Sequence, residues 1–362
     1  MALDREFNLV ALLNYSNLQW SRKYHESGTF SIRISPEQYD SSFKYIYTNE
    51  RPETGKIVQV NYVQNDNQSY IQLSGYFLEN ELNRMVVYTP GEGNIVDGPE
   101  WLGKIGPAED VAFDYFNAFS QIKFNVDNAT TTFNLGIASG TNTHRGVQAQ
   151  HYRDNSYLGS KIYHILKPSG MTYRVRYDFE ENKQYFEVWS GLNRTSEQMV
   201  NNPIVFSTQY YNLKNPNVLL DNSTYKSGCI VTVNKNENDE ASVAYTRALL
   251  DLDQLHEDNA FLSLQSSLSV DDFDNSNDYY QALDNEGRLE KNTKWLRTMN
   301  IEFDASAGSY EYMQDFDIGD VCDLEIYEIG ISAEARLIGC YEVIKDNDWS
   351  LTLEFGTPII KR

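Results

Sequence analysis

The chain has 362 residues and a formal net charge of −22 at neutral pH, with 52 acidic and 30 basic residues. This length allows two or three domains with cores of their own. The acidic balance argues against a phosphate-binding face and against attraction to an anionic membrane, and no stretch approaches the roughly 18 consecutive apolar residues of a membrane span.

The first hundred residues predict strands joined by polar turns. Apolar and polar residues alternate over 30–34, 56–63 and 70–78, which is the period of a strand with one solvated face. A polar run between the last two predicts a hairpin. The stretch 81–88 is expected to extend this meander until a Pro-Gly segment at 89–94 breaks it.

Two helices and a second hairpin are expected in the next hundred residues. Apolar residues at helical spacing predict a helix over 107–120, with Pro107 in its first turn. A shorter helix over 161–167 stops before a proline and a glycine. The alternating runs 171–179 and 184–189 flank a polar turn and predict the hairpin.

The remainder predicts more strands and one more helix. Strands are expected at 205–207, 229–233 and 241–250, with an acidic loop over 234–240 between the last two. An acidic, Asn-rich stretch ends in the N-cap of a helix over 278–296. Strands at closely spaced positions then fit a small barrel; they are 300–303, 321–327, 334–344 and 349–355.

Three cysteines, Cys229, Cys322 and Cys340, occur without paired spacing. We expect buried free thiols in a protein that folds in a reducing cytosol. The first residues lack the charged-then-apolar pattern of a secretory signal. We therefore expect a soluble protein without membrane insertion.

A series of short motifs runs in order from about residue 17 to residue 355. They are Asn17–Trp20 followed by Arg22 and Tyr24, Gly28–Ile34, Leu73–Arg84, Gly106–Asp110, Glu187–Thr195, Val205–Ser207 with Asn212–Leu213, and Tyr312–Asp320. Together they resemble a family of siphovirus tail-hub proteins. Asn193 stands where that family usually has Asp, and Tyr76 where it often has Arg.

The resemblance implies a mostly β fold with minor α structure. It implies two small β-barrel domains like tail-tube proteins, with an α/β insertion domain, as in phage baseplate hub proteins. On this basis residues 1–100 with 204–250 form the first barrel domain and 101–203 the insertion domain. Residues 251–298 form an acidic linker and helical segment, and 299–362 form the second barrel domain.

The resemblance also implies a structural role without catalysis. Such hubs form homotrimers, whose two barrels per chain dock on the hexameric distal tail protein. The other partners implied are the tape-measure protein and downstream tail-tip or receptor-binding proteins. Phage DNA crosses the lumen without specific binding, and a carboxylate-lined channel would repel its phosphates. The implied location is the virion tail tip, after assembly in the bacterial host cytoplasm.

A cell-wall hydrolase is one alternative from another class, less favoured than a β-rich glycan-binding module at the host surface. Ser120 and Lys123 match S-x-x-K, Tyr210–Asn212 matches Y-x-N, and Lys226–Gly228 resembles K-T-G. Such a nucleophile belongs at a helix N-terminus, where free amides stabilise negative charge. Because Ser120 lies at the other end of the predicted helix, a chance match is the better interpretation.

Binding chemistry is the second alternative. His144, His151 and Asp154 are near enough in sequence to ligate zinc, but an exposed loop explains them better. The acidic stretch 271–278 lacks the glycine and glutamate of a calcium loop. Trp101 suits sugar stacking in a glycan-binding module at the host surface, although packing in the core is the simpler role. We assign no catalytic, metal or cofactor residue.

Overall fold

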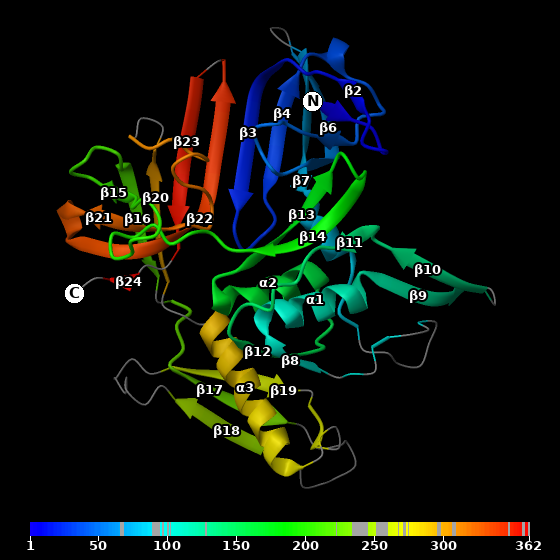
Figure 1. Cartoon of the computed structure of the whole chain (residues 1–362), viewed down its shortest axis with the longest axis vertical. Helices are drawn as coiled ribbons and strands as arrows, with labels where there is room; N and C mark the ends of the chain where they lie inside the picture. The colour runs from blue at the N-terminus through cyan, green and yellow to red at the C-terminus, as the bar shows by residue number, and fades with distance from the viewer. Residues whose placement is uncertain are drawn as a thin grey trace.

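One large, mostly antiparallel sheet organises the chain. The computed structural model describes residues 1–362 apart from 66–68, 89–94, 96–97, 100, 102, 127–128, 222, 234–244, 251–259, 267, 271–272, 274, 295–297, 306–308, 347, 357–358 and 361–362. Fourteen of the described strands belong to this sheet, whose main path runs β16-β20-β23-β22-β3-β4-β7-β6-β5-β1-β2. Its long central strands stand side by side in Figure 1.

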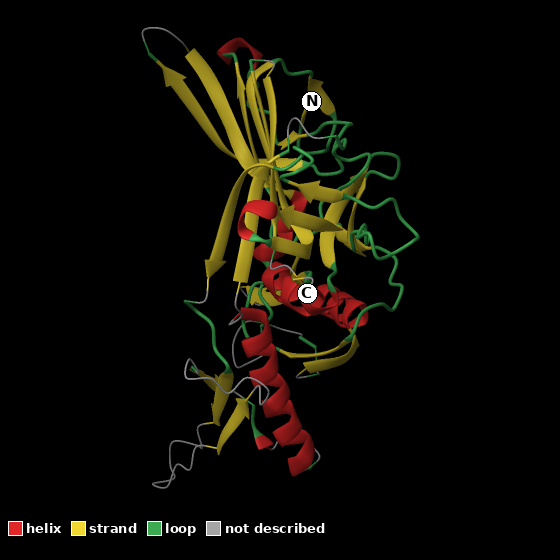
Figure 2. Ribbon diagram, turned by 90° about the vertical axis from the view of Figure 1, so that its left-hand side faces the viewer, coloured by secondary structure: helices red, strands yellow, loops and turns green. Residues whose placement is uncertain are grey.

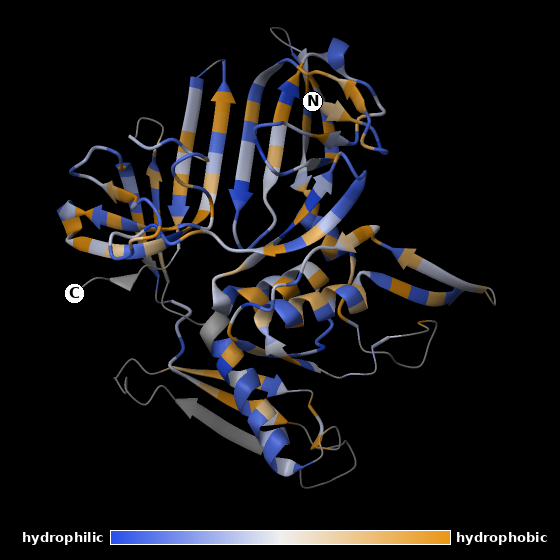
Figure 3. Cartoon of the chain, viewed as in Figure 1, coloured by the Kyte–Doolittle hydropathy of each residue, from blue (hydrophilic) through white to orange (hydrophobic). Residues whose placement is uncertain are grey.

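The N-terminal β unit occupies one end of this sheet. Its strands are β1 (Ala2–Leu3), β2 (Leu9–Ala11), β3 (Tyr15–Lys23), β4 (Thr29–Ile34), β5 (Tyr45–Ile46), β6 (Gly55–Gln64) and β7 (Ser69–Phe77). Alternate residues point inward and build a core that includes Trp20, Phe30 and Leu73, and Figure 3 shows the resulting apolar and polar bands. The three predicted strands and the β6–β7 hairpin are confirmed.

The C-terminal β unit occupies the other end. Its strands are β20 (Thr298–Asp304), β21 (Val321–Ile326), β22 (Ile331–Lys345), β23 (Asp348–Phe355) and β24 (Ile359–Ile360), joined by β15 (Val205–Ser207) and β16 (Lys214–Asp221). Its core is aromatic: Phe206 lies 5.1 Å from Phe303 and 5.7 Å from Phe355 between ring centroids. The four predicted C-terminal strands are confirmed.

The expected barrels are not closed in the described part of the chain. The second half of β22 pairs with both β3 and β23, so the two β units merge into one open sheet. The middle segment also pairs differently from the expected grouping. β15 hydrogen-bonds to β21 and β16 to β20, which attaches both strands to the C-terminal unit.

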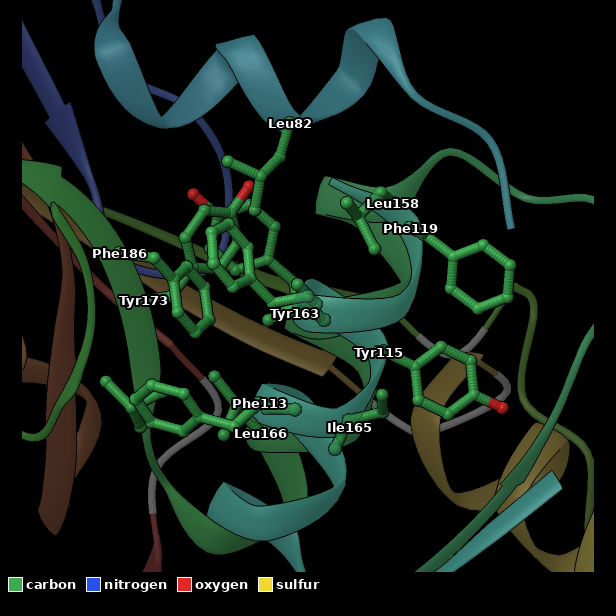
Figure 4. Close-up of a cluster of buried hydrophobic side chains, with 14 of the residues drawn as sticks. Leu82, Phe113, Tyr115, Phe119, Leu158, Tyr163, Ile165, Leu166, Tyr173 and Phe186 are labelled. Carbon is green, nitrogen blue, oxygen red and sulfur yellow. The ribbon is translucent and has the colours of Figure 1, made fainter. Parts of the chain in front are cut away.

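An α/β unit packs under the N-terminal sheet. It contains α1 (Ala108–Phe119), α2 (Leu158–Leu166), β8 (Gly103–Pro107), β9 (Gln121–Val126), β10 (Ala129–Asn134), β11 (Ile137–Ser139), β12 (Gln148–Tyr152), β13 (Thr172–Asp178) and β14 (Lys183–Trp189). The two helices and the β13–β14 hairpin share one core, to which Phe113, Leu166 and Phe186 contribute (Figure 4). In this core the Phe116 ring stacks on Phe186, with ring centroids 4.3 Å apart. Both predicted helices and the hairpin are confirmed.

The prediction of a strand over 81–88 is wrong. Residues Leu78–Arg84 form a 3₁₀ helix instead. Leu78, Leu82 and Met85 are all buried, and their spacing of four and three residues suits a helical turn better than the alternation of a strand.

A small unit lies at the end of the molecule opposite the β22–β23 hairpin (Figures 1 and 2). It comprises β17 (Gly228–Val233), β18 (Tyr245–Leu250), β19 (Phe261–Ser266) and α3 (Ser276–Lys294). The Asn275 side chain caps α3 by accepting a hydrogen bond from the Asp278 amide at 3.0 Å. The β17–β18 pairing and the helix are confirmed, while the loop 234–240 lies outside the described residues.

Among the described helices, none combines the length and the apolar composition that a membrane span requires. All three cysteines are free and buried, as expected.

Candidate assembly site

Motif residues that are far apart in sequence meet where the N-terminal, α/β and C-terminal units contact one another. We call this place the junction. Its members are Arg22, Tyr24, Glu53, Glu79, Gly191, Arg194, Tyr312, Asp317, Gly319 and Asp320. Most of them belong to four of the seven motifs that carry the family resemblance, so those four motifs share one structural location.

Tyr24, just after β3, contacts all three units. Its hydroxyl donates a hydrogen bond to the backbone oxygen of Gly170, which follows α2, at 2.8 Å. The same hydroxyl accepts a bond from the amide of Gly191 at 3.3 Å. The guanidinium of Arg336, from β22, lies 5.4 Å from the ring centroid. The side chain is only 1% exposed.

Two glycines permit this close packing. Gly319 has φ +88°, and a Cβ atom there would lie 2.3 Å from the Tyr24 ring. A Cβ atom on Gly191 would lie 2.0 Å from the carbonyl carbon of Gly319. Backbone conformation and space therefore both require glycine at 319, and space alone requires it at 191.

A buried ion pair attaches the loop after β14 to β21. Asp320 is 3% exposed and accepts hydrogen bonds from Arg194 Nε and from the Leu192 amide, each at 2.7 Å. The Arg194 amide donates to the backbone oxygen of Val321 at 2.8 Å. Removing one partner of such a pair leaves an uncompensated buried charge, so the contact fixes the loop in place.

Arg22 forms the other charged centre of the junction. It is 3% exposed and donates to Glu53 at 2.7 Å, to the Tyr312 hydroxyl at 2.7 Å and to Asp317 at 2.5 Å. Burial by itself lowers the pKa of Arg22. The charges of Glu53, Tyr312 and Asp317 outweigh burial and raise that pKa well above its ordinary value.

A second arginine pair strengthens the contact between the β units. Arg51 makes two hydrogen bonds to Glu342 of β22, one of them at 2.8 Å. The Tyr312 ring lies near both Arg51 and Arg22, at 5.6 and 5.8 Å. Our sequence reasoning missed this pair. Glu342 occupies an inward position of a buried strand, and that position was the available signal for a buried partner.

A cavity of about 50 Å³ lies inside the junction and is lined by Arg22, Glu53 and Glu79, among others. Glu79 is 7% exposed, and its Oε1 accepts a hydrogen bond from the Gly28 amide at 3.3 Å. Burial, with the charge of Glu53, raises the pKa of Glu79 to about 8. Glu79 is therefore mostly protonated at neutral pH.

The residues considered for hydrolysis lie in structural positions. Ser120 caps the C-terminal end of α1, with its amide bonded to the Phe116 oxygen at 2.8 Å. Asn212 accepts from the Ser207 amide at 2.8 Å and donates to the Val205 oxygen at 2.9 Å, which holds a turn. Because the C-terminal end of a helix disfavours a developing anion, Ser120 is poorly placed as a nucleophile.

The residues considered for zinc have separate partners. His144 contacts Asp110 at 2.6 Å, and Asp154 contacts Lys161 at 2.8 Å. His151 is 2% exposed, and burial lowers its pKa to about 3. Among the described residues, no group of three or more His, Cys, Asp or Glu side chains is arranged to hold a metal ion.

The remaining candidates are the acidic stretch 271–278 and Trp101. Most aspartates of the acidic stretch 271–278 lie outside the described residues. Trp101 packs edge-on against Tyr115 and Phe119, with ring centroids 5.0 and 5.9 Å away. The Trp101 ring therefore contributes to the core of the α/β unit.

The outer face of the large sheet, away from the cores, carries hydroxyl and amide side chains over β4, β7 and β6, together with the guanidinium of Arg33 on β4. Gln72 donates to Ser31 Oγ at 3.0 Å, and Ser74 donates to Gln59 at 3.3 Å. Carboxylates occur farther along this face, where Glu302 of β20 pairs in register with Glu354 of β23.

Two strands of the sheet, β16 at one end of its path and β6 near the other, leave edges open within the described residues. β5 covers β6 at Gly55 and Lys56, and the Ile57 amide donates to the Lys44 oxygen at 2.8 Å, so β6 has β7 on one side alone only from Val58 onward. Val60 and Tyr62 on this strand are 48% and 55% exposed. At the opposite end, β16 pairs with β20 alone. Open edges present unpaired backbone groups to another chain.

Comparison with known proteins yields one family and several structures. The family model described as Siphovirus ReqiPepy6 Gp37-like protein matches residues 1–357, and no curated protein matches the chain. The 43 kDa tail protein of prophage MuSo2 from Shewanella oneidensis is 10% identical, with TM-score 0.57 and 94% of each chain covered. The tail protein from Neisseria meningitidis MC58 is 11% identical, with TM-score 0.55 and coverage of 95% of this chain and 92% of that one. At sequence identities this low, the two structural matches show a shared fold and nothing more.

Proposed function

The chain belongs to the Siphovirus ReqiPepy6 Gp37-like family, and on this premise we propose that it is a structural, non-enzymatic hub protein at the tip of a long non-contractile phage tail. Two tail proteins with the same fold support this role. The hub joins the tail tube to the apparatus for host attachment and DNA ejection. It is a virion component that assembles in the cytoplasm of the bacterial host.

The observation that carries the proposal is the pair of open edges on one continuous sheet. β16 ends the main path on one side, and β6 lies near the other end, followed only by the short strands β5, β1 and β2; both β6 and β16 have an unpaired side within the described residues. In a head-to-tail ring, the β6 edge of one copy faces the β16 edge of the next, and closure leaves neither edge free. We assign the ring as a homotrimer.

The two β units supply the repeated element of this ring. The N-terminal unit acts as the first tube-like module, and the C-terminal unit, completed by β15 and β16, acts as the second. Three chains then present six modules to the hexameric distal tail protein. The tape-measure protein and the downstream tail-tip or receptor-binding proteins are the other partners. The junction sets the angle between the modules, on which the ring depends.

We assign the outer face of the sheet to the channel through which DNA passes. Its amide and hydroxyl groups hydrogen-bond to one another across strands, and Arg33 on β4 is held by Gln72 and by the Tyr70 ring, so β4 and β7 offer phosphates a single cation rather than a row. Glu302 and Glu354 add negative charge at one end of this wall. A surface of this kind suits passage of DNA without specific binding.

The test is the assembly state of the purified protein and its location in the virion. We expect light scattering to give the mass of three 41.7 kDa chains, and antibodies against the chain to label the tail tip in electron micrographs. A Tyr62→Glu substitution on the open edge should reduce assembly, whereas Ser31→Thr on the outer face should not. A monomer at every concentration, together with unlabelled tail tips, would contradict the hub role.

One surface feature favours a second candidate, a glycan-binding module at the host surface. Tyr210, Tyr211 and Tyr327 are 63%, 78% and 73% exposed. The Tyr327 amide donates to Thr208 Oγ1 at 3.2 Å, which brings the two segments together. Aromatic faces of this kind can stack on sugar rings. This candidate is supported if the protein binds cell-wall fragments and a Tyr210→Ala, Tyr211→Ala double variant does not. If the wild-type protein does not bind them, only the hub role remains.

A further inference from the structure

The loop between β14 and β15 presents two adjacent apolar side chains to solvent. Met199 is fully exposed and Val200 is 90% exposed. The loop is nevertheless well ordered around Gln198. The Gln198 side-chain nitrogen donates to the oxygens of Thr195 and Asn201 at 3.0 and 2.8 Å, and its oxygen accepts from the amides of residues 200 and 201, each at 2.7 Å.

The base of this loop is anchored as firmly as its tip. The Ser196 amide donates to Asp323 at 2.8 Å, and the Asn201 side chain donates to the Asn193 oxygen at 2.9 Å. A loop held in one shape loses little conformational entropy when it binds. Two wholly exposed apolar side chains on such a support are typical of a contact for another protein.

The same chain offers a groove that fits this loop. The groove has a volume of about 510 Å³, lies between β12 and α3, and has Ile105, Val147 and Leu289 among its lining residues. Ile105 and Val147 are 70% and 55% exposed. The basic side chains that line it are Lys167 and Arg288, and no carboxylate is among its described lining residues.

Charge selects the groove as the partner of the loop. Glu197, two residues before Met199, is the exposed acidic residue of the loop, whereas Asp320 and Asp323, which hold the loop from beneath, are buried. On a chain with net charge −22, a surface lined by basic groups and lacking carboxylates is a complementary target. We propose that the Met199–Val200 loop of one copy inserts into the groove of a second copy. This inference rests on the proposed function, because it names a contact inside the homo-oligomer.

Other apolar pockets of the described surface fit the loop less well. One beside Trp20 has a volume of only about 120 Å³, and its lining includes Glu50 as well as Glu342 with its partner Arg51. Another beside Phe7 has a volume of about 360 Å³, and its lining includes neither lysine nor arginine. The second of these pockets provides a matched control.

Disulfide trapping tests the contact directly. The three native cysteines are all fully buried, so they give little background. Met199→Cys and Ile105→Cys are made in separate proteins, mixed and oxidised. We expect a covalent dimer between the two variants, several-fold more abundant than from Met199→Cys mixed with Leu9→Cys. Leu9 lines the 360 Å³ pocket and is 57% exposed. Equal yields from both mixtures would overturn the inference.

Light scattering then separates this contact from the ring itself. Met199→Asp and Arg288→Glu should each weaken self-association at least tenfold, with circular dichroism confirming that they fold. If the wild-type protein forms a trimer and both variants assemble equally well, the contact is wrong and the proposed function stands. If trapping succeeds but the wild-type mass is not that of a trimer, the contact stands and the trimer is wrong. A monomeric wild-type protein without trapping contradicts both.

Discussion

Replacing Glu79 by glutamine should stabilise the protein at neutral pH. Glu79 is 7% exposed in the junction, beside Glu53 and Arg22 in a cavity of about 50 Å³. Burial raises the pKa of its carboxyl group from 4.5 to about 8. A glutamine side chain has the same shape, keeps the acceptor for the Gly28 amide and carries no charge at any pH.

The sign and size of the effect follow from proton linkage. Between pH 4.5 and 8 the folded protein keeps the Glu79 proton that the unfolded chain has released, so the stability that this proton provides is complete below pH 4.5 and is lost as pH rises towards 8. At about 1.4 kcal/mol per pH unit, the wild-type protein loses up to about 3 kcal/mol by pH 7. Glu79→Gln should recover about 1–3 kcal/mol of this at pH 7 and nothing below pH 4.5.

Urea unfolding followed by tryptophan fluorescence, repeated from pH 4.5 to pH 8.5, measures this difference. Glu81→Gln is the matched control in the same 3₁₀ helix. Glu81 pairs with Lys56 at 2.7 Å and with Arg84 at 2.8 Å, so its replacement should destabilise the protein. If Glu79→Gln proves no more stable than the wild-type protein at pH 7–8, and the pH dependence is unchanged, the assignment of a buried, protonated carboxyl group is wrong.

Three further substitutions test the junction and the core. Gly319→Ala should destabilise the protein by about 2 kcal/mol or more, because it adds strain at positive φ and a clash; Gly330→Ala, which has φ +66° but no atom within 4 Å of the added methyl group, should lose only about 1 kcal/mol in urea unfolding. Arg194→Ala should lose about 3 kcal/mol by leaving Asp320 unpaired, and adding Asp320→Asn should restore part of this in a double-mutant cycle. Burial lowers the pKa of His151 to about 3. The stability that its neutral form provides is therefore present above the unfolded pKa near 6.5 and is lost as pH falls towards 3. His151→Gln should flatten the loss of stability between pH 6.5 and 4, and an unchanged slope would contradict this.

Local patterns predicted the elements well because each element depends on near neighbours in sequence. The alternation over 171–179 and 184–189 sufficed for the β13–β14 hairpin, and helical spacing sufficed for α1. The prediction for 81–88 failed because the buried residues Leu78 and Leu82 are four positions apart. An even spacing also puts both side chains on one side of a strand, so the pattern did not distinguish a strand from a short helix. Pairing between distant strands was not predictable. Nothing in the local sequence shows that β22 pairs with β21 over its first half and with β3 over its second half.

The sequence identified most residues of the junction as members of motifs, but it did not predict that these residues meet at one location. The residues around Arg22 come from β3 and from segments up to 295 positions away, so only the fold brings them together. Arg51 and Glu342 belong to no motif. The sequence did not single out the loop at Met199 either. Its relevance comes from the complete exposure of Met199 on an ordered turn, which only the structure shows.

The position of the motifs bears on how a hub of this kind is constrained. Residues at an outer surface can change together with a partner, but a residue that sets the angle between two rigid units affects every contact that those units make. Tyr24, Gly319 and Asp320 occupy such positions, because each is buried or sterically required where three units meet. A small rotation there would move both open edges, β6 and β16, relative to each other. Ring closure tolerates little error of this kind, since every copy repeats it. The junction would therefore vary less than the faces that contact other tail proteins.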